Sequence, residues 1–314
     1  MKLFRHHWPA ADGDPTSLPY YRLVLRGWSQ VCFQSNELTG LCFLAAALVA
    51  SPIAAAYLLV AGTIAPAGRM ALGGRHPEIS TGLPGLNPSL IGLALPTFFE
   101  TGWTNTGMWT VLVLCVAATV LLARLAAALP FPVLALPFLI VLWVVWALAP
   151  SISVLQRKPF AELTSAAYHP VEAVLSGLGE AVFSATIWSG LLFLAGLLVS
   201  NWRHAVIAVI GAVISTVVSY RVALMSSSSL NAGLFGFNGV LTAVAVYALC
   251  GSRLRLAVLG ALIAAVLTPA FTRLGVPAAS APFVLSTWLV LALGWFDRRW
   301  FAPARPVTGH NAPD

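Results

Sequence analysis

The chain has 314 residues, of which 59% are hydrophobic and only 9% are charged, whereas a soluble globular domain carries about 25% charge. This composition predicts an integral membrane protein with room for roughly ten spans joined by short loops. The net charge of +7 is placed at span ends and tails, so nucleic-acid binding is not expected. The four cysteines lie scattered in apolar runs and predict neither a metal site nor a disulfide.

The chain is expected to begin with a polar, basic tail at 1–24 that lacks the apolar core of a signal peptide. Arg22, Arg26 and Trp28 are typical of an interfacial anchor in front of a first span. A first membrane repeat is expected at 25–150. Its apolar segments are expected at 29–50, 52–72, 83–99, 107–129 and 131–149.

A second membrane repeat is expected at 174–297, after a linker at 151–173 that is the least apolar stretch of the interior. Its apolar segments are expected at 176–200, 204–224, 229–249, 255–274 and 279–297, and a C-terminal tail follows at 298–314. Basic residues near both termini indicate that both ends are cytoplasmic. Arg157 and Lys158, in a linker on the opposite side, depart from that tendency.

Each half contains a Gly-containing break that leads into an apolar segment too short to cross a membrane. Residues 85–96 read GLNPSLIGLALP and residues 236–247 read GFNGVLTAVAVY, with Gly, Asn and Leu at the same places. A span needs about 20 apolar residues, so these segments are typical of re-entrant half-helices. Irregular backbone survives at membrane depth where protein buries it or a polar path runs beside it. The paired breaks therefore predict a solute site between two repeats.

Further matches indicate that the two halves are repeats of each other. Residues 39–51 and 189–201 are identical at seven of thirteen positions at an offset of 150. Two shorter pairs are QVCF (30–33) with EAVF (180–183), and ALPF (135–138) with SAPF (280–283). An odd number of crossings per half would invert the repeats. The sequence predicts an all-α integral membrane protein with two inverted repeats of about five transmembrane helices, each with a re-entrant half-helix.

These paired motifs, in this order, resemble the urea transporters, the family of bacterial and vertebrate urea channels, over residues 25–297. The resemblance implies two re-entrant helices, a pore through each protomer between the repeats, and a homotrimer. It also implies passive, channel-like passage of urea or a similar small amide across a lipid bilayer, without a cofactor. A multi-pass protein of the plasma membrane, the inner membrane in a bacterium, is expected.

The resemblance also implies a set of substrate-binding positions. They are Gln30, Phe33, Leu86, Leu90, Glu180, Phe183, Phe237, Leu241 and Ser280. Gln30 and Glu180 match polar side chains at the outer and inner ends of the filter, the three phenylalanines match aromatic walls of a flat slot, and Leu90 and Leu241 match paired leucines at its centre. Ser280 matches a central hydroxyl. Leu86 stands where the family has an aromatic residue, and Ala135 stands where the first half should carry the second hydroxyl.

The chemistry of urea fits these residue types. Urea is planar, neutral and polar, with four N–H donors and one carbonyl. A low-dielectric passage must replace its bonds to water with fixed acceptors, because an unpaired amide group costs on the order of 2–7 kcal/mol. Carbonyls at broken helix ends and the side-chain oxygens of Gln30 and Glu180 are such acceptors, and flat aromatic faces would select for planarity.

Each candidate also has a structural interpretation that the sequence leaves open. Gln30 alone fits interhelical hydrogen bonding, and Ser280 fits bonding to its own helix. Asn87 and Asn238 fit caps of the half-helices, and the phenylalanines fit core or lipid-facing positions. Glu180 fits a solvated place near a membrane surface. At the bilayer centre its charge would cost at least ~2.5–3.5 kcal/mol, which favours a functional role.

Other functions would need residues that this sequence lacks or places elsewhere. An ammonium channel would need histidines in the pore, but all six lie in tails, loops or span ends. An aquaglyceroporin would repeat Asn-Pro-Ala, whereas the two copies here read NPS at 87–89 and NGV at 238–240. No catalytic constellation, metal cluster or phosphate loop indicates an enzyme. The alternative that stays open is an ion- or proton-coupled transporter, or a channel for another small amide or neutral solute, with Glu180 as the coupling site.

Overall fold

The computed structural model describes residues 18–74, 76–159, 167–274 and 276–300. Over these residues the chain is helical, apart from one isolated bridge between Phe99 and Arg157. Residues 1–17 of the tail expected at 1–24, residues 301–314 of the tail expected at 298–314, and the middle of the expected linker, 160–166, lie outside the described residues. The all-α prediction is confirmed for the part that the structure describes.

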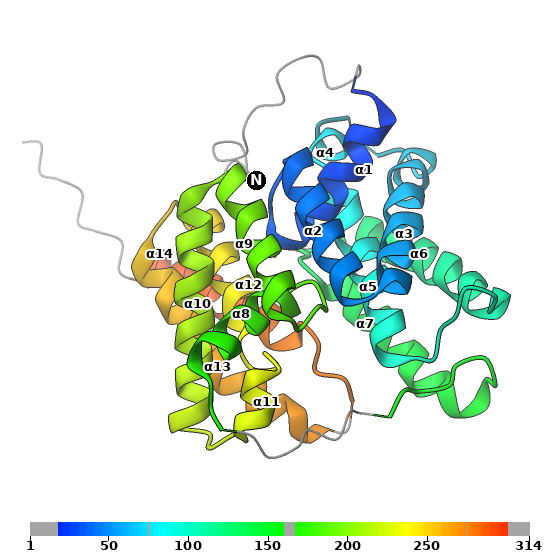
Figure 1. The fold of residues 1–314 in the computed structure, drawn as a ribbon. Coiled ribbons are helices and arrows are strands. Elements are labelled where there is room, and N and C mark those ends of the chain that lie inside the picture. Colours follow the sequence, from blue (N-terminus) through cyan, green and yellow to red (C-terminus); the bar gives the residue numbers. More distant parts are fainter. Residues whose placement is uncertain (1–17, 75, 160–166, 275, 301–314) are drawn as a thin grey trace, which may run out of the picture.

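The helices follow the same order in the two halves of the chain (Figure 1). The first half contains α1 (Tyr20–Ser29), η3 (Gln30–Cys32), α2 (Glu37–Ala50), α3 (Pro52–Ala71), α4 (His76–Ser80), η4 (Leu83–Gly85), α5 (Leu86–Phe98), α6 (Thr106–Ala126), α7 (Leu136–Leu148) and η5 (Ala149–Ser151). The second half contains α8 (Pro170–Glu180), α9 (Ile187–Ser200), α10 (Trp202–Arg221), α11 (Ser227–Asn231), α12 (Phe237–Leu249), α13 (Leu254–Phe271), η6 (Thr272–Leu274) and α14 (Ala281–Trp300).

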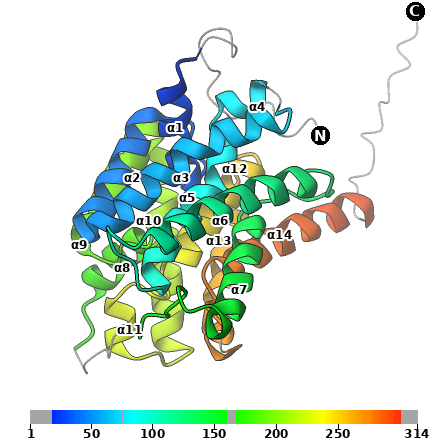
Figure 2. The same cartoon turned by 90° about the vertical axis from the view of Figure 1, so that its right-hand side faces the viewer.

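Several helices have the composition and length of membrane spans. Among the described residues, α3, α6, α10 and α13 with η6 are each long and apolar enough to cross a membrane. Helix α1 with η3 and helix α2 pass the same test together, with a bend of 70° between them. In Figure 2, α6 lies on the face toward the viewer, and it packs on α5. These elements make the chain a multi-pass membrane protein.

A short helix follows each break, at the place where a re-entrant half-helix was expected. Helices α5 and α12 each have 13 residues, which at about 1.5 Å per residue gives roughly 20 Å. That length is shorter than the ~30 Å hydrocarbon core of a bilayer. Each follows a short helix and a break, α4 with η4 in the first half and α11 in the second.

The apolar segments expected at 29–50 and 176–200 are each interrupted, which the sequence analysis did not predict. The chain breaks between α1 and α2 and again between α8 and α9. Phe33 in the first break and Phe183 in the second have left-handed backbone angles, with φ of 59° and 54°. A residue in this left-handed conformation cannot continue a right-handed helix. Each helix therefore stops there, and the chain restarts in a new direction.

The interfacial anchor expected at Arg22, Arg26 and Trp28 is also a wrong interpretation. These residues belong to α1, and the side chains of Arg26 and Trp28 are buried, with exposed fractions of 7% and 4%. The Nε atoms of Arg22 and Arg26 donate to Glu37 Oε1 at 2.6 and 2.9 Å. The two arginines therefore hold α1 against the start of α2, where the Glu37 carboxylate accepts a hydrogen bond from each of them.

Arg157 and Lys158 depart from the expected charge asymmetry because the fold uses them at helix ends. The Arg157 guanidinium donates to the carbonyl of Trp146 at 2.5 Å, in the last turn of α7. Lys158 Nζ donates to the carbonyl of Pro96 at 2.7 Å, in the last turn of α5. The last carbonyls of a helix lack partners and carry partial negative charge. The two cations thus stabilise both helix ends and fasten the beginning of the linker to the first half.

The two halves meet along α2 and α9 through reciprocal contacts. Thr39 Oγ1 in α2 donates to the carbonyl of Gly196 in α9 at 2.7 Å. Ser189 Oγ in α9 donates to the carbonyl of Ala46 in α2 at 2.8 Å. Each residue of one bond lies 150 positions from its counterpart in the other. Such exchange of equivalent contacts is the pattern of a two-fold axis.

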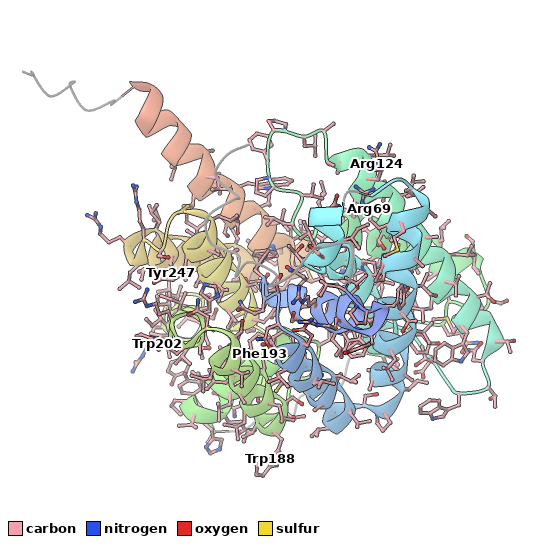
Figure 3. All side chains as sticks on the ribbon, turned by 90° about the horizontal axis from the view of Figure 1, so that it is seen from above. Arg69, Arg124, Trp188, Phe193, Trp202 and Tyr247 are labelled. Carbon is pink, nitrogen blue, oxygen red and sulfur yellow. The ribbon has the colours of Figure 1, made fainter. Side chains whose placement is uncertain are left out.

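Phe43 and Phe193, also 150 positions apart, mark the centre of this relation. Their rings stack with centroids 4.6 Å apart and an interplanar angle of 10°. Figure 1 shows α2 and α9 side by side where the halves adjoin, and Figure 3 shows Phe193 at that junction. The halves are therefore related by a pseudo-two-fold axis between these two rings.

Candidate functional site

The first helix break holds a buried amide whose oxygen is free. Gln30 begins η3 and is fully buried. Its Nε2 donates to the carbonyl of Thr81 at 2.6 Å and to Ser35 Oγ at 3.0 Å. Because a carbonyl can only accept, the amide nitrogen must face Thr81. Gln30 Oε1 is then left buried without a hydrogen-bond partner among the described residues, which makes it an unused acceptor.

The second break begins with Glu180, the last residue of α8. Its side chain is half-buried. The carboxylates of Glu37 and Glu78 are paired with arginines, but that of Glu180 has no ion-pair partner among the described residues. Gln30 and Glu180 hold equivalent places, since the carbonyl of each accepts from the backbone N–H three residues on at 2.9 Å. The structure therefore supports their pairing across the repeat, with one neutral and one acidic acceptor.

The phenylalanines of the two breaks each reach into the opposite half. The ring of Phe33 meets that of Phe283, at the start of α14, with centroids 5.9 Å apart. The ring of Phe183 meets that of Phe138, at the start of α7, with centroids 6.1 Å apart. The paired motifs of the sequence thus come together crosswise, so that each aromatic pair contains one residue from each half.

Asn238 holds the start of α14 against the start of α12. Its Nδ2 donates to the carbonyl of Ala279 at 3.2 Å, and its Oδ1 accepts from the backbone N–H of Phe283 at 3.1 Å. Ala279 has a φ of 41°. The asparagine therefore satisfies a free N–H of one helix from the first turn of another, and it fixes the tight turn that comes before Ser280.

Asn87 makes the same two bonds in the first half. Its Nδ2 donates to the carbonyl of Leu134 at 3.0 Å, and its Oδ1 accepts from the N–H of Phe138 at 2.9 Å. Neither asparagine caps its own half-helix, because Gly85 and Gly236 occupy the N-cap positions of α5 and α12. The capping interpretation was wrong. The asparagines join the half-helices to α7 and α14 instead.

Ser280 lies between the two anchor points of Asn238, directly before α14. It is buried, and its Oγ has no hydrogen-bond partner among the described residues, so the hydroxyl does not bond back to its own helix. A buried hydroxyl without a partner loses on the order of 1–3 kcal/mol. The equivalent Ala135 is the N-cap of α7 and has no side-chain oxygen. The site is therefore symmetric in its backbone but has a hydroxyl on one side alone.

A model of a family described as "Urea transporter" matches residues 21–294. The chain belongs to the urea transporter family. It is 27% identical to Urea transporter 1 of Rattus norvegicus over 301 residues, which cover 89% of this chain and 78% of that protein. It is 26% identical to Urea transporter 1 of Ovis aries with the same coverage, and 25% identical to Urea transporter 1 of Mus musculus over 74% of this chain.

Family membership confirms the resemblance seen in the paired motifs and identifies this chain as a transport protein rather than an enzyme. The remaining residues expected at the site lie on the first two turns of the two half-helices. These are Leu86 and Leu90 in α5 and Phe237 and Leu241 in α12, and all four are buried in one continuous core. The first break contacts both half-helices, because η3 packs against α5 and α12.

Sequence reasoning missed several residues that shape this region. Phe138 and Phe283 stand at the ends of the repeated ALPF and SAPF motifs, so the repeat itself carried a signal for them. Thr81 and Ser35, which orient the amide of Gln30, gave no comparable signal. Thr81 is far from Gln30 in the chain, and Ser35 lies within the first break, which hydropathy does not reveal.

Proposed function

We propose that this family member conducts urea passively through a filter between its two halves. The observation that supports this most strongly is that two buried acceptors, Gln30 Oε1 and Ser280 Oγ, have no hydrogen-bond partner among the described residues and lie near aromatic pairs built from both halves. The N–H groups of urea are suited to occupy them, and Glu180 offers a third acceptor from the second break.

In this filter, polar groups accept hydrogen bonds from urea, and apolar groups form the walls of the passage. Gln30 and Glu180 receive the N–H groups at the two ends, and Ser280 bonds urea at the centre. The rings of Phe33, Phe183 and Phe237, with Leu86, Leu90 and Leu241, form flat apolar walls. Because the amide groups find acceptors along the path, the desolvation cost of on the order of 2–7 kcal/mol is offset, while thicker solutes are excluded.

The finer architecture follows the same proposal. Repeats at 25–150 and 174–297, joined by the linker at 151–173, are inverted in the membrane and together give about ten spans. Each protomer has its own pore, and three protomers form the assembly. The protein lies in the plasma membrane, the inner membrane of a bacterium, with both termini cytoplasmic, in keeping with their basic residues.

Flux into liposomes that contain the purified protein tests the function. Urea uptake is expected to run down its gradient without a sodium or proton gradient and without steep saturation at low millimolar urea. Acetamide, ammonium, glycerol and water are compared in the same vesicles. Uphill accumulation driven by an imposed ion or proton gradient would contradict the proposal and favour a coupled transporter. The carboxylate of Glu180, which has no ion-pair partner in the part of the chain that the structure describes, is the feature that favours that alternative.

Phe237→Ala tests the flat slot. Removing the ring from the first turn of α12 takes away an apolar wall, so glycerol permeability relative to urea is expected to rise several-fold. Phe235→Ala is the matched control, since Phe235 is also buried but belongs to a separate cluster with Ala173 and Leu230. An unchanged glycerol-to-urea ratio in folded Phe237→Ala would show that this ring does not line the path.

A further inference from the structure

Gln34 and His204 form a polar contact between the two halves at the first break. Gln34 is buried in the break, directly after Phe33. His204 lies in the first turn of α10, in the other half of the chain. Gln34 Nε2 is 2.9 Å from His204 Nδ1, and the same side chain donates to the carbonyl of Cys32 at 2.6 Å. One amide therefore connects the backbone of the break with the opposite half.

The geometry fixes the chemistry of this contact. The amide nitrogen is a donor only, so His204 Nδ1 must accept, and the ring proton lies on Nε2. With Nδ1 unprotonated, its separation of 3.3 Å from Gln34 Oε1 joins two acceptors and is not a hydrogen bond. The rings of His204 and Tyr247 of α12 lie perpendicular to each other, with centroids 5.9 Å apart. The neutral imidazole is thus held on α10 and α12 and presents an acceptor to the break.

Gln34 fastens the backbone on both sides of Phe33. Its side chain bonds the carbonyl of Cys32, and its own carbonyl accepts from Ser29 Oγ at 2.6 Å. Phe33 between them has a φ of 59°, a left-handed conformation that costs about 1–2 kcal/mol for a residue with a Cβ. Such a conformation persists only where its surroundings enforce it, and the ring direction of Phe33 follows from it.

The second break provides an internal comparison. There Ser184 takes the place of Gln34, and its Oγ bonds the carbonyl of Val182 at 3.1 Å, the counterpart of the bond to Cys32. The hydroxyl is too short to reach further, and the position 150 residues before His204 is Ala54. The bond within the break is therefore shared by both halves, whereas the connection to the opposite half belongs to the first break.

We propose that His204 is a positioning residue for the filter: through Gln34 it holds Phe33 in place against Phe283 and so sets the width of the slot at the first break. This rests on the proposed urea conduction. Without the histidine, Gln34 keeps its bond within the break but loses its fixed point in the other half. The Phe33 ring then gains freedom, and discrimination against solutes thicker than urea falls while urea still passes.

The variants are His204→Ala, His204→Asn, Gln34→Ala and the double variant Gln34→Ala/His204→Ala. In His204→Ala we expect the glycerol-to-urea permeability ratio to rise about three- to tenfold, the scale of one hydrogen bond. His204→Asn places an amide oxygen near the position of Nδ1 and is expected to restore the ratio. The double variant should match Gln34→Ala. His169→Ala, at an exposed histidine, should behave like the wild type.

A second readout does not depend on urea conduction. The thiol of Cys32 is buried beside Phe33, and its alkylation by a small maleimide, followed by peptide mass spectrometry, reports loosening of the break. Faster labelling of Cys32 in His204→Ala, reversed in His204→Asn, supports the proposal even if wild type fails to conduct urea. Unchanged labelling and permeability in folded His204→Ala would overturn it, as would an Asn variant no better than Ala or additive effects in the double variant.

Discussion

Glu180→Ala is expected to lose most of its urea flux, whereas Glu180→Gln is expected to fold and conduct at a rate comparable to the wild type. The equivalent residue in the first half is Gln30, an amide whose Oε1 has no hydrogen-bond partner among the described residues. A carboxyl group and an amide both accept N–H bonds. Alanine removes the acceptor, and a lost bond of roughly 1–3 kcal/mol lowers flux by on the order of five- to 150-fold.

The measurement compares wild type, Glu180→Gln and Glu180→Ala in liposomes, with and without an imposed pH gradient. Glu172→Gln is the matched control, because it makes the same change near the start of the same helix α8. A proton-coupled mechanism makes the opposite prediction for the glutamine variant, which would then lose gradient-driven transport. The proposal is that this side chain accepts hydrogen bonds from urea and does not need its charge to do so. A well-folded Glu180→Gln protein without urea flux would therefore overturn it.

Gly190→Ala is expected to destabilise the protein strongly. A Cβ built at Gly190 in α9 would lie 1.9 Å from the carbonyl oxygen of Leu175 in α8. At the equivalent Gly40 in α2 the distance is 2.0 Å, to the carbonyl oxygen of Leu25 in α1. Both obstacles are backbone atoms, so no side-chain rotation relieves the clash. The helices on either side of a break can pack this closely only without a side chain.

The change in stability is measured as the apparent unfolding midpoint in detergent, by circular dichroism or size-exclusion after heating. We expect Gly190→Ala to lower the midpoint by on the order of 10 °C or more, because steric overlap with backbone gives the largest mutational effects. Gly102→Ala is the control, since nothing lies within 4 Å of a Cβ there, and its midpoint should hardly move. If both variants unfold together, the close packing of α8 and α9 is not what limits stability.

The sequence alone was sufficient for the features that arise from local pattern. Hydropathy and the scarcity of charge indicated a membrane protein, and recurrence at an offset of 150 indicated two related halves. The short apolar runs after Gly85 and Gly236 correctly predicted the 13-residue helices α5 and α12. Each of these signals lies within one stretch of chain or in a comparison of two stretches. It can therefore be recognised without knowing which residues are in contact in the folded protein.

The breaks after α1 and α8 were not recognised, although Phe33 is followed by Gln-Ser-Asn and Phe183 by Ser-Ala-Thr. One signal was available: Asn36 and Thr186 are residue types that begin helices, and their side chains accept from the N–H groups of Thr39 and Ser189. Hydropathy averages over such a position. The break in the helix can be predicted only by searching for N-cap residues inside the apolar segments.

The tertiary structure decided the contacts between residues that are far apart in the chain. That Phe33 meets Phe283, that Asn238 binds the start of α14 rather than its own helix, and that Gln34 meets His204 all depend on residues between 45 and 250 positions apart. Such pairings are selected by packing, which compares many possible neighbours at once in three dimensions. The sequence therefore determined which residue types recur in the two halves, and folding alone determined which of them face each other and which acceptors are left free.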